Sequence, residues 1–69
     1  MDAIDVTGKS SRIAISYEEL LIINYALNEI CNGISVFEFD TRVGASHERV
    51  TAFLKEIGSL LDKIDSIAG

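Results

Sequence analysis

Two side chains in this sequence carry chemistry that enzymes often use, a thiol at Cys31 and an imidazole at His47. A catalytic nucleophile needs a general base within hydrogen-bond reach, and a zinc site needs three or four ligands of the Cys, His or carboxylate type. Cys31 falls on the apolar side of a predicted helix, and His47 lies in the first turn of another, beside Glu48. Neither has a second Cys or His nearby, because the chain contains one of each. We therefore predict no enzyme activity, no cofactor and no metal site.

Phosphate recognition is the second chemistry that the residue types suggest. The donors for contacts with DNA bases and phosphates would be Arg42, Arg49, Thr51 and Lys55. Against this, the net charge is −5, and residues 17–32 include Glu but neither Lys nor Arg. Neutralisation of phosphates supplies most of the non-specific affinity for nucleic acid, so this charge balance disfavours such a partner. Nucleic-acid binding is therefore the alternative interpretation.

The segment 39–54, FDTRVGASHERVTAFL, resembles the helix-turn-helix motif of DNA-binding regulators. Gly44 stands at the turn position, and a small residue and a Ser cap follow it. Apolar residues occupy the buried positions of the motif on both sides of the turn, namely Phe39, Val43, Val50 and Phe53. The sequence departs from the motif at Asp40, where the pattern prefers Ala for close helix contact. The resemblance implies two helices joined by a tight turn, with the exposed face of the second helix as the recognition surface.

A helix is predicted over residues 16–32. Ser16 and Glu19 have the spacing of a capping box, and Asn32-Gly33 is a typical helix stop. At 100° per residue, one arc of this helix is apolar and forms its predicted core face. That arc consists of Leu20, Ile23, Ala26, Leu27, Ile30 and Cys31.

A second face of the same helix mixes Tyr, Leu and Asn. Its residues are Tyr17, Leu21, Asn24, Tyr25 and Asn28. Tyr is common in protein interfaces because its ring buries area while its hydroxyl keeps a hydrogen bond. Two interpretations stay open for this face: packing against the N-terminal segment, or an interface with another protein.

Two further helices are predicted, over residues 36–43 and 46–67. The second has the clearest pattern in the sequence, three interlocked series of apolar residues that repeat every seven positions. These are Val50, Ile57 and Ile64; Phe53, Leu60 and Ile67; and Leu54, Leu61 and Ala68. The stripe is wider than a two-stranded coiled coil needs. Its phase runs unbroken past Gly58, so we expect one continuous helix.

The N-terminal residues 1–15 alternate apolar and polar positions around the turn-rich TGKSS. They form either an extended arm or a small β-hairpin, and an isolated hairpin is barely stable in water. We therefore predict an all-α fold, a three-helix, helical hairpin-like domain at 16–69 that follows this N-terminal arm.

The balance between length and hydrophobicity predicts a partner subunit. The chain has 69 residues, of which 48% are hydrophobic, and its single Cys allows no intrachain disulfide. Domains of this size have small cores and often rely on oligomerisation. Its longest aliphatic run, 20–23, is far too short for a membrane span. We predict a cytoplasmic homodimer that acts as a small non-catalytic regulatory or adaptor protein, without indicating which helix forms the subunit interface.

The helix-turn-helix alternative predicts binding to duplex DNA that weakens steeply as salt rises, because each phosphate contact releases counterions. Arg49→Ala and Lys55→Ala should each weaken that binding. A salt titration by fluorescence anisotropy tests this, and the absence of binding at low salt would eliminate the alternative.

Overall fold

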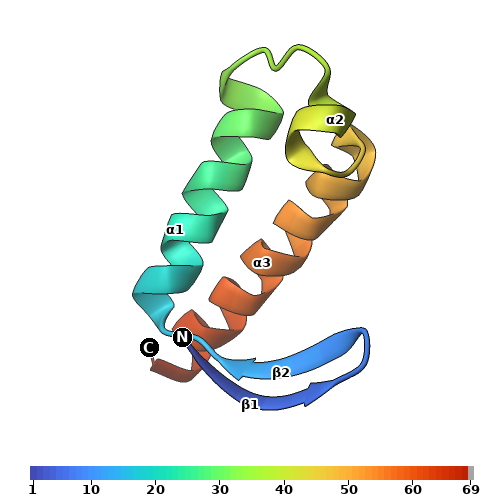
Figure 1. Ribbon diagram of the computed structural model, residues 1–69. Coiled ribbons are helices and arrows are strands. Elements are labelled where there is room, and N and C mark those ends of the chain that lie inside the picture. Colours follow the sequence, from blue (N-terminus) through green and yellow to red (C-terminus); the bar gives the residue numbers. More distant parts are fainter. Residues whose placement is uncertain (69) are drawn as a thin grey trace.

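The computed structural model describes residues 1–68, which form a β-hairpin followed by two long helices with a short helix between them (Figure 1). In chain order the elements are β1 (Asp2–Thr7), β2 (Ser10–Ala14), α1 (Tyr17–Asn28), the π-helical turn η1 (Glu29–Gly33), α2 (Phe39–Val43) and α3 (His47–Ala68). The fold is therefore mixed, and the all-α prediction is wrong.

The hairpin formed by β1 and β2 is the feature that the all-α prediction missed. Its two-residue loop places Gly8 at φ +52°, a backbone region that glycine enters without steric cost. Thr7 pairs with Ser10, and the register shifts around Ile4, where a β-bulge interrupts the ladder. An isolated hairpin is unstable, but this one is tied at its base to the start of α1.

The core lies between α1 and α3, which run in opposite directions and pack along their length (Figure 1). Leu20 of α1 and Ile57 and Leu61 of α3 form its buried centre. Partly buried aliphatic side chains pack around them, namely Ile15, Leu21, Ile23, Leu27 and Ile64. The predicted helical hairpin is thus present, with a smaller core than the predicted apolar arcs contain.

Helix α1 begins as the sequence predicts and ends differently. The Ser16 hydroxyl accepts a hydrogen bond from the Glu19 N–H at 3.1 Å, and the Glu19 carboxylate accepts one from the Ser16 N–H at 2.9 Å. At its C-terminal end the helix widens into η1, in which the Ile34 N–H donates to the Glu29 carbonyl. Residues 29–33 therefore form a π-helical turn in place of a simple α-helical stop.

Helix α2 is shorter than predicted, and α3 has the predicted continuity. Glu38 adopts a left-handed conformation at φ +52°, which prevents α2 from beginning at residue 36. Gly44 ends α2 at φ +90°, and the Ser46 hydroxyl caps α3 by accepting a hydrogen bond from the Arg49 N–H. Helix α3 then runs through Gly58 without a break, which confirms the prediction of one long helix.

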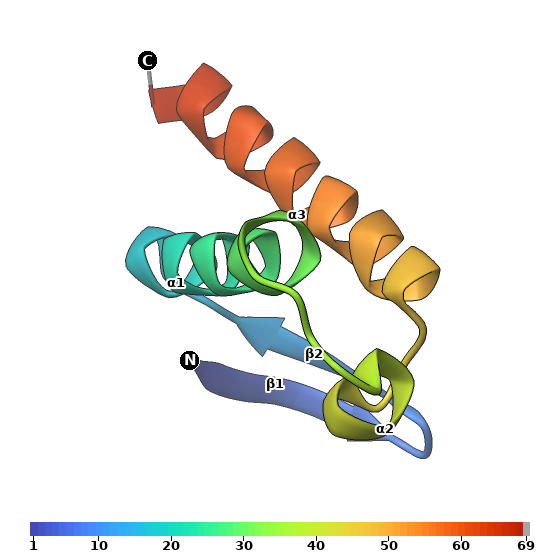
Figure 2. The ribbon, with the colours of Figure 1, turned by 90° about the horizontal axis from the view of Figure 1, so that it is seen from above.

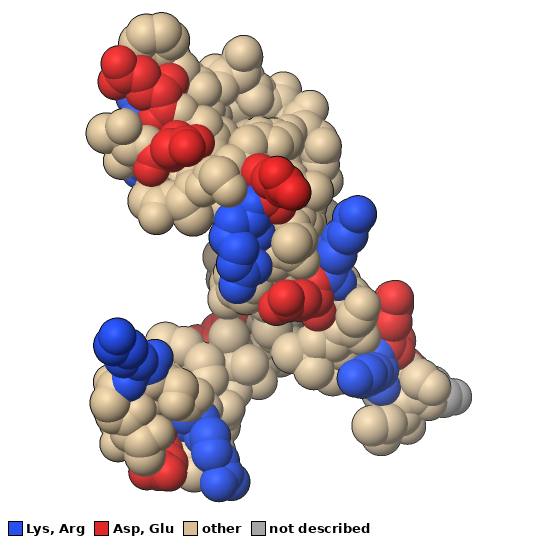
Figure 3. Space-filling model, turned by 90° about the vertical axis from the view of Figure 1, so that its right-hand side faces the viewer, with Lys and Arg blue, Asp and Glu red and all other residues tan. Residues whose placement is uncertain are grey.

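The molecule is flat and open, with principal extents of 37 × 34 × 16 Å. The hairpin and α2 lie on the same side of the α1–α3 pair, near opposite ends of it (Figures 1 and 2). Figure 3 shows the wide open space that this leaves between the hairpin and the upper part of the molecule. The radius of gyration is 13.7 Å, whereas a compact chain of this length has about 11 Å. Among the described residues, no helix meets the length and apolarity that a bilayer crossing requires.

We expect Gly44→Ala to lower the free energy of unfolding by about 1 kcal/mol, because a Cβ disfavours the left-handed backbone at this position. No described atom lies within 4 Å of the added Cβ, so the cost is conformational. Glu38→Gly should instead raise the free energy of unfolding, because glycine adopts the left-handed backbone conformation of this position without the steric cost that Glu incurs. Thermal denaturation followed by circular dichroism measures both variants, and a loss of stability in both would contradict this account.

Candidate protein-interaction surfaces

The packed pair α1 and α3 has two flanks, one on each side of the line along which the helices touch. Tyr17 of α1 and Asp65 of α3 meet on one of them, which we call the tyrosine flank. Glu19 lies about 200° around α1 from Tyr17 and therefore belongs to the other side. Met1 at the start of the hairpin pairs with Glu19, so the hairpin is attached on that second side.

The tyrosine flank carries the residues that the sequence predicts as a protein interface. Tyr17 is 43% exposed and Tyr25 is 69% exposed, so both rings are available for contact. Asn28 is exposed and accepts a hydrogen bond from the Asn32 side chain at 3.1 Å, while Asn24 is half-buried. Leu21 instead packs against the core. The hairpin is tied to the opposite flank, so within residues 1–68 it does not cover this surface.

The Tyr17 hydroxyl on the tyrosine flank has a raised pKa. The Asp65 carboxylate raises the pKa of Tyr17 by accepting a hydrogen bond from the phenol and by its negative charge. This contact links the first turn of α1 to the last turns of α3. Tyr25 is the more exposed of the two rings.

The opposite side, which we call the apolar flank, is the more hydrophobic of the two. On α3 its exposed residues are Phe53, Leu60 and Ile67, at spacings of seven, with exposed fractions of 39%, 40% and 88%. On α1 the same side carries Ile23, Ala26 and Ile30 after Glu19. Only one edge of the wide stripe of α3 is therefore covered by α1, and the other edge is bare.

A small apolar hollow lies at the upper end of this flank. It has a volume of about 240 Å³ and is lined by Ala45, Arg49, Val50 and Phe53. The sequence does not reveal the hollow, because it depends on where the α2–α3 turn places Ala45. The bare edge beside it was detectable in principle, since one neighbouring helix cannot cover a stripe of that width.

The hairpin adds a third apolar area beside the apolar flank. All residues of both strands are exposed, and the aliphatic ones include Ile4, Val6 and Ile13. The register puts Val6 and Ile13 on one face, because Val6 pairs with Ser11 and Ile13 lies two residues further along the same strand. Neither strand packs extensively against a helix. One face and both outer edges are thus open to contact.

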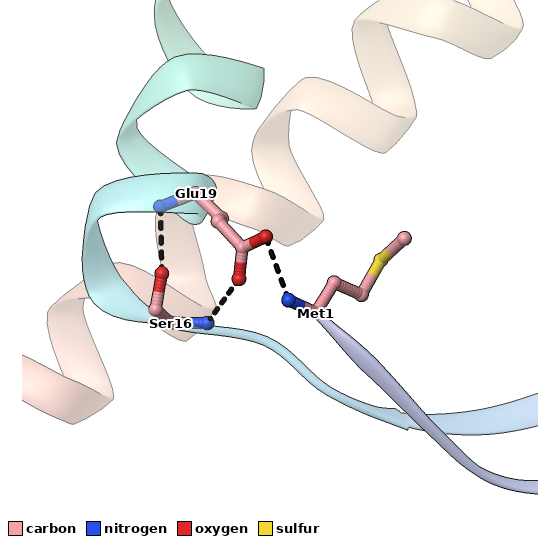
Figure 4. A network of polar contacts seen from close by, with 3 residues as sticks. All are labelled: Met1, Ser16 and Glu19. Carbon is pink, nitrogen blue, oxygen red and sulfur yellow. Dashed lines mark hydrogen bonds and ion pairs between the residues drawn. The ribbon is translucent and has the colours of Figure 1, made fainter.

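A short polar network fixes the base of the hairpin to α1 (Figure 4). The Met1 amino group donates to Glu19 Oε2 at 2.8 Å, and the Ser16 N–H donates to the other carboxylate oxygen. These interactions lower the pKa of Glu19 from 4.5 to about 2, the Met1 hydrogen bond most and the Ser16 N–H next. One carboxylate therefore caps α1 and holds the N-terminal strand.

The stretch that resembles a helix-turn-helix motif has the predicted turn. His47 joins the two helices of the stretch, because its ring meets the Phe39 ring of α2 edge to face with centroids 5.0 Å apart. It also ties α3 to η1, because His47 Nε2 lies 2.9 Å from the Cys31 carbonyl oxygen. Asp40 is exposed, so the departure from the motif at this position does not lie in a close helix contact.

The residues predicted to contact nucleic acid are not gathered on one face. Arg49 lines the hollow of the apolar flank, whereas Thr51 and Lys55 share a shallow depression with Glu48 on another side of α3. Arg42 is exposed on α2, and the Thr51 hydroxyl lies 3.4 Å from His47 Nδ1. Basic and acidic side chains are interspersed over the surface seen in Figure 3. Nucleic-acid binding stays a prediction, and the surface on which it would have to occur carries both acidic and basic side chains.

The remaining chemical groups of the sequence lie apart from one another. The Cys31 side chain is buried, and the group of this residue that His47 hydrogen-bonds is the backbone carbonyl. Within residues 1–68, no group of three or more His, Cys, Asp and Glu side chains is arranged to hold a metal ion. Comparisons with protein-family models, curated proteins and solved structures found no match to this chain.

The lowered pKa of Glu19 makes the attachment of the hairpin sensitive to acid. A carboxylate with a depressed folded-state pKa stabilises the fold above its unfolded value, and this contribution is lost as pH falls. We therefore expect stability to decline between pH 4.5 and about 2, partly through Glu19. Acid titrations followed by circular dichroism should show a weaker decline for Glu19→Gln.

Glu18→Gln is the matched control, since it removes an exposed carboxylate from the same helical turn. An acid profile that Glu18→Gln flattens as much as Glu19→Gln would show that the network at Met1 and Ser16 is not the cause.

Proposed function

We propose that this protein is a small non-catalytic adaptor or regulatory module that self-associates and contacts a further protein. The observation that carries the proposal is the amount of surface that the chain leaves exposed. The accessible surface is 5382 Å², whereas a compact monomer of this mass exposes about 4,250 Å². The excess is about 1,100 Å², which exceeds the roughly 800 Å² that each partner contributes to a standard protein interface.

The chemistry of the exposed residues assigns different roles to the two flanks. Stable homodimer interfaces are more apolar than transient ones, and the apolar flank exposes Phe53, Leu60 and Ile67 along one helix. The tyrosine flank combines aromatic rings with side-chain amides, a composition suited to a partner that binds and leaves. Self-association is accordingly assigned to the apolar flank. The tyrosine flank, with Tyr17, Asn24, Tyr25 and Asn28, is assigned to the further protein, whereas Leu21 of the predicted set packs against the core.

The non-catalytic part of the proposal rests on the separation of the reactive groups. The Cys31 thiol is buried, and both ring nitrogens of His47 lie near atoms of the chain, the Cys31 carbonyl and the Thr51 hydroxyl. A nucleophile with a base at hand would need these groups to face one another at an accessible site. We assign the protein to the cytoplasm, where a single unpaired thiol stays reduced.

The proposal predicts concentration-dependent self-association that Leu60→Glu abolishes, because a charge would then be desolvated in the subunit contact. Sedimentation velocity across a concentration series measures the assembly. Circular dichroism should show that Leu60→Glu stays folded, since Leu60 is 40% exposed in the single chain.

Tyr25→Ala is the matched control on the other flank and should leave self-association unchanged. A wild-type chain that sediments as a monomer at every concentration would refute self-association. If Tyr25→Ala alone dissociates the assembly, the two flanks have the reverse roles.

A further inference from the structure

The apolar flank of α3 carries a row of charges beside its apolar row. Arg49, Glu56 and Lys63 are exposed and recur every seven residues, next to Phe53, Leu60 and Ile67. The signs of the charges alternate along the helix. Within the described residues, neither Glu56 nor Lys63 belongs to an intrachain ion pair. Both charges are therefore free to meet a partner that lies along the same flank.

We propose that the occupant of this flank is a second copy of the chain, packed antiparallel along α3 about a two-fold axis at Leu60. The inference rests on the proposed self-association and adds its geometry. In this arrangement Leu60 meets Leu60 of the second copy. Phe53 and Ile67 each lie seven residues, or about 10.5 Å, from the axis, on opposite sides of it. Phe53 of one copy therefore faces Ile67 of the second copy, and Ile67 of the first faces Phe53 of the second.

Charge complementarity selects the antiparallel direction. Glu56 lies four residues before the axis and Lys63 three residues after it, so Glu56 comes within about 1.5 Å, along the helix axis, of Lys63 in the second copy. Two such pairs form by symmetry. In a parallel arrangement Glu56 would lie level with Glu56 and Lys63 with Lys63, and like charges across an interface are unfavourable.

The hollow at the upper end of the flank provides a seat for the most exposed apolar side chain. Ile67 is 88% exposed, and the antiparallel arrangement brings it to the level of Phe53 in the second copy. Phe53 lines the hollow together with Ala45, Arg49 and Val50, and its volume is about 240 Å³. The hollow is open to solvent and lined mainly by apolar atoms, so an aliphatic side chain of the second copy can enter it from outside.

The position of the hairpin is consistent with this occupant. The hairpin is attached on the Glu19 side of α1 and borders the wide open space seen in Figure 3. Its exposed Ile4, Val6 and Ile13 offer apolar cover at the margin of the flank. The open side therefore contributes to the excess accessible surface of the single chain, and the second copy would cover it.

Charge reversal tests the direction of packing. Glu56→Lys and Lys63→Glu should each weaken self-association by roughly tenfold, because each turns two attractive pairs into two repulsive ones. The double variant Glu56→Lys/Lys63→Glu should restore it. An equimolar mixture of the two single variants should form heterodimers more tightly than either forms homodimers. Sedimentation equilibrium and native mass spectrometry measure these quantities.

Cross-linking tests the position of the axis. Leu60→Cys should oxidise to a covalent dimer, because the two-fold axis brings the two introduced thiols together. Ser59→Cys is the control one residue away on an exposed side of α3 and should stay monomeric on a denaturing gel. Cys31 is buried and therefore does not interfere.

The outcomes separate this inference from the proposed function. If the wild-type chain does not associate, both fail. If it associates while the single charge reversals have no effect, the packing is parallel or lies elsewhere, and only the antiparallel arrangement is overturned. A dimer that Ser59→Cys cross-links and Leu60→Cys does not would likewise overturn the axis at Leu60.

Discussion

The contact between α1 and α3 is the interaction on which the rest of this structure depends. Leu20, Ile57 and Leu61 form the buried centre of the molecule, and Ile15 brings the base of the hairpin against it. Burial of apolar area is the main favourable contribution to folding, so these few side chains provide the platform on which the other elements are placed. The α2–α3 turn and the hairpin both project from this one helical pair (Figure 2).

A core of this size leaves much of the apolar surface uncovered. In a chain of 69 residues a two-helix contact can use one side of each helix. The remaining exposed hydrophobic residues lie on the apolar flank, on the hairpin, on other sides of α1 and in the segment between η1 and α2, where Ile34 and Phe37 are exposed. Exposed apolar patches of this extent usually mark interaction surfaces. The small core therefore explains the flat shape and the exposed apolar side, and the proposed self-association would bury that side.

Several local features follow directly from residue types. The capping box of Ser16 and Glu19, the turn at Gly44 and the continuity of α3 through Gly58 were all predicted, because each depends on neighbours within one helical turn or on an unbroken periodicity. The sequence does not decide between an arm and a hairpin for residues 1–15, and the all-α prediction is wrong, because the stability of two short strands depends on how they are attached. That attachment includes the second oxygen of Glu19, which binds Met1 eighteen residues away in sequence.

The sequence by itself determined that α1 and α3 begin after the caps Ser16 and Ser46, that a short helix lies between them, and that α3 carries a wider apolar stripe than one neighbouring helix covers. Only the tertiary structure decided which edge of that stripe α1 covers, and hence that Phe53, Leu60 and Ile67 stay exposed while Ile57 and Leu61 are buried. It also placed the hairpin on the apolar flank. The physical reason is that periodicity specifies angles around one helix, whereas the burial of each angle depends on the position of a second helix.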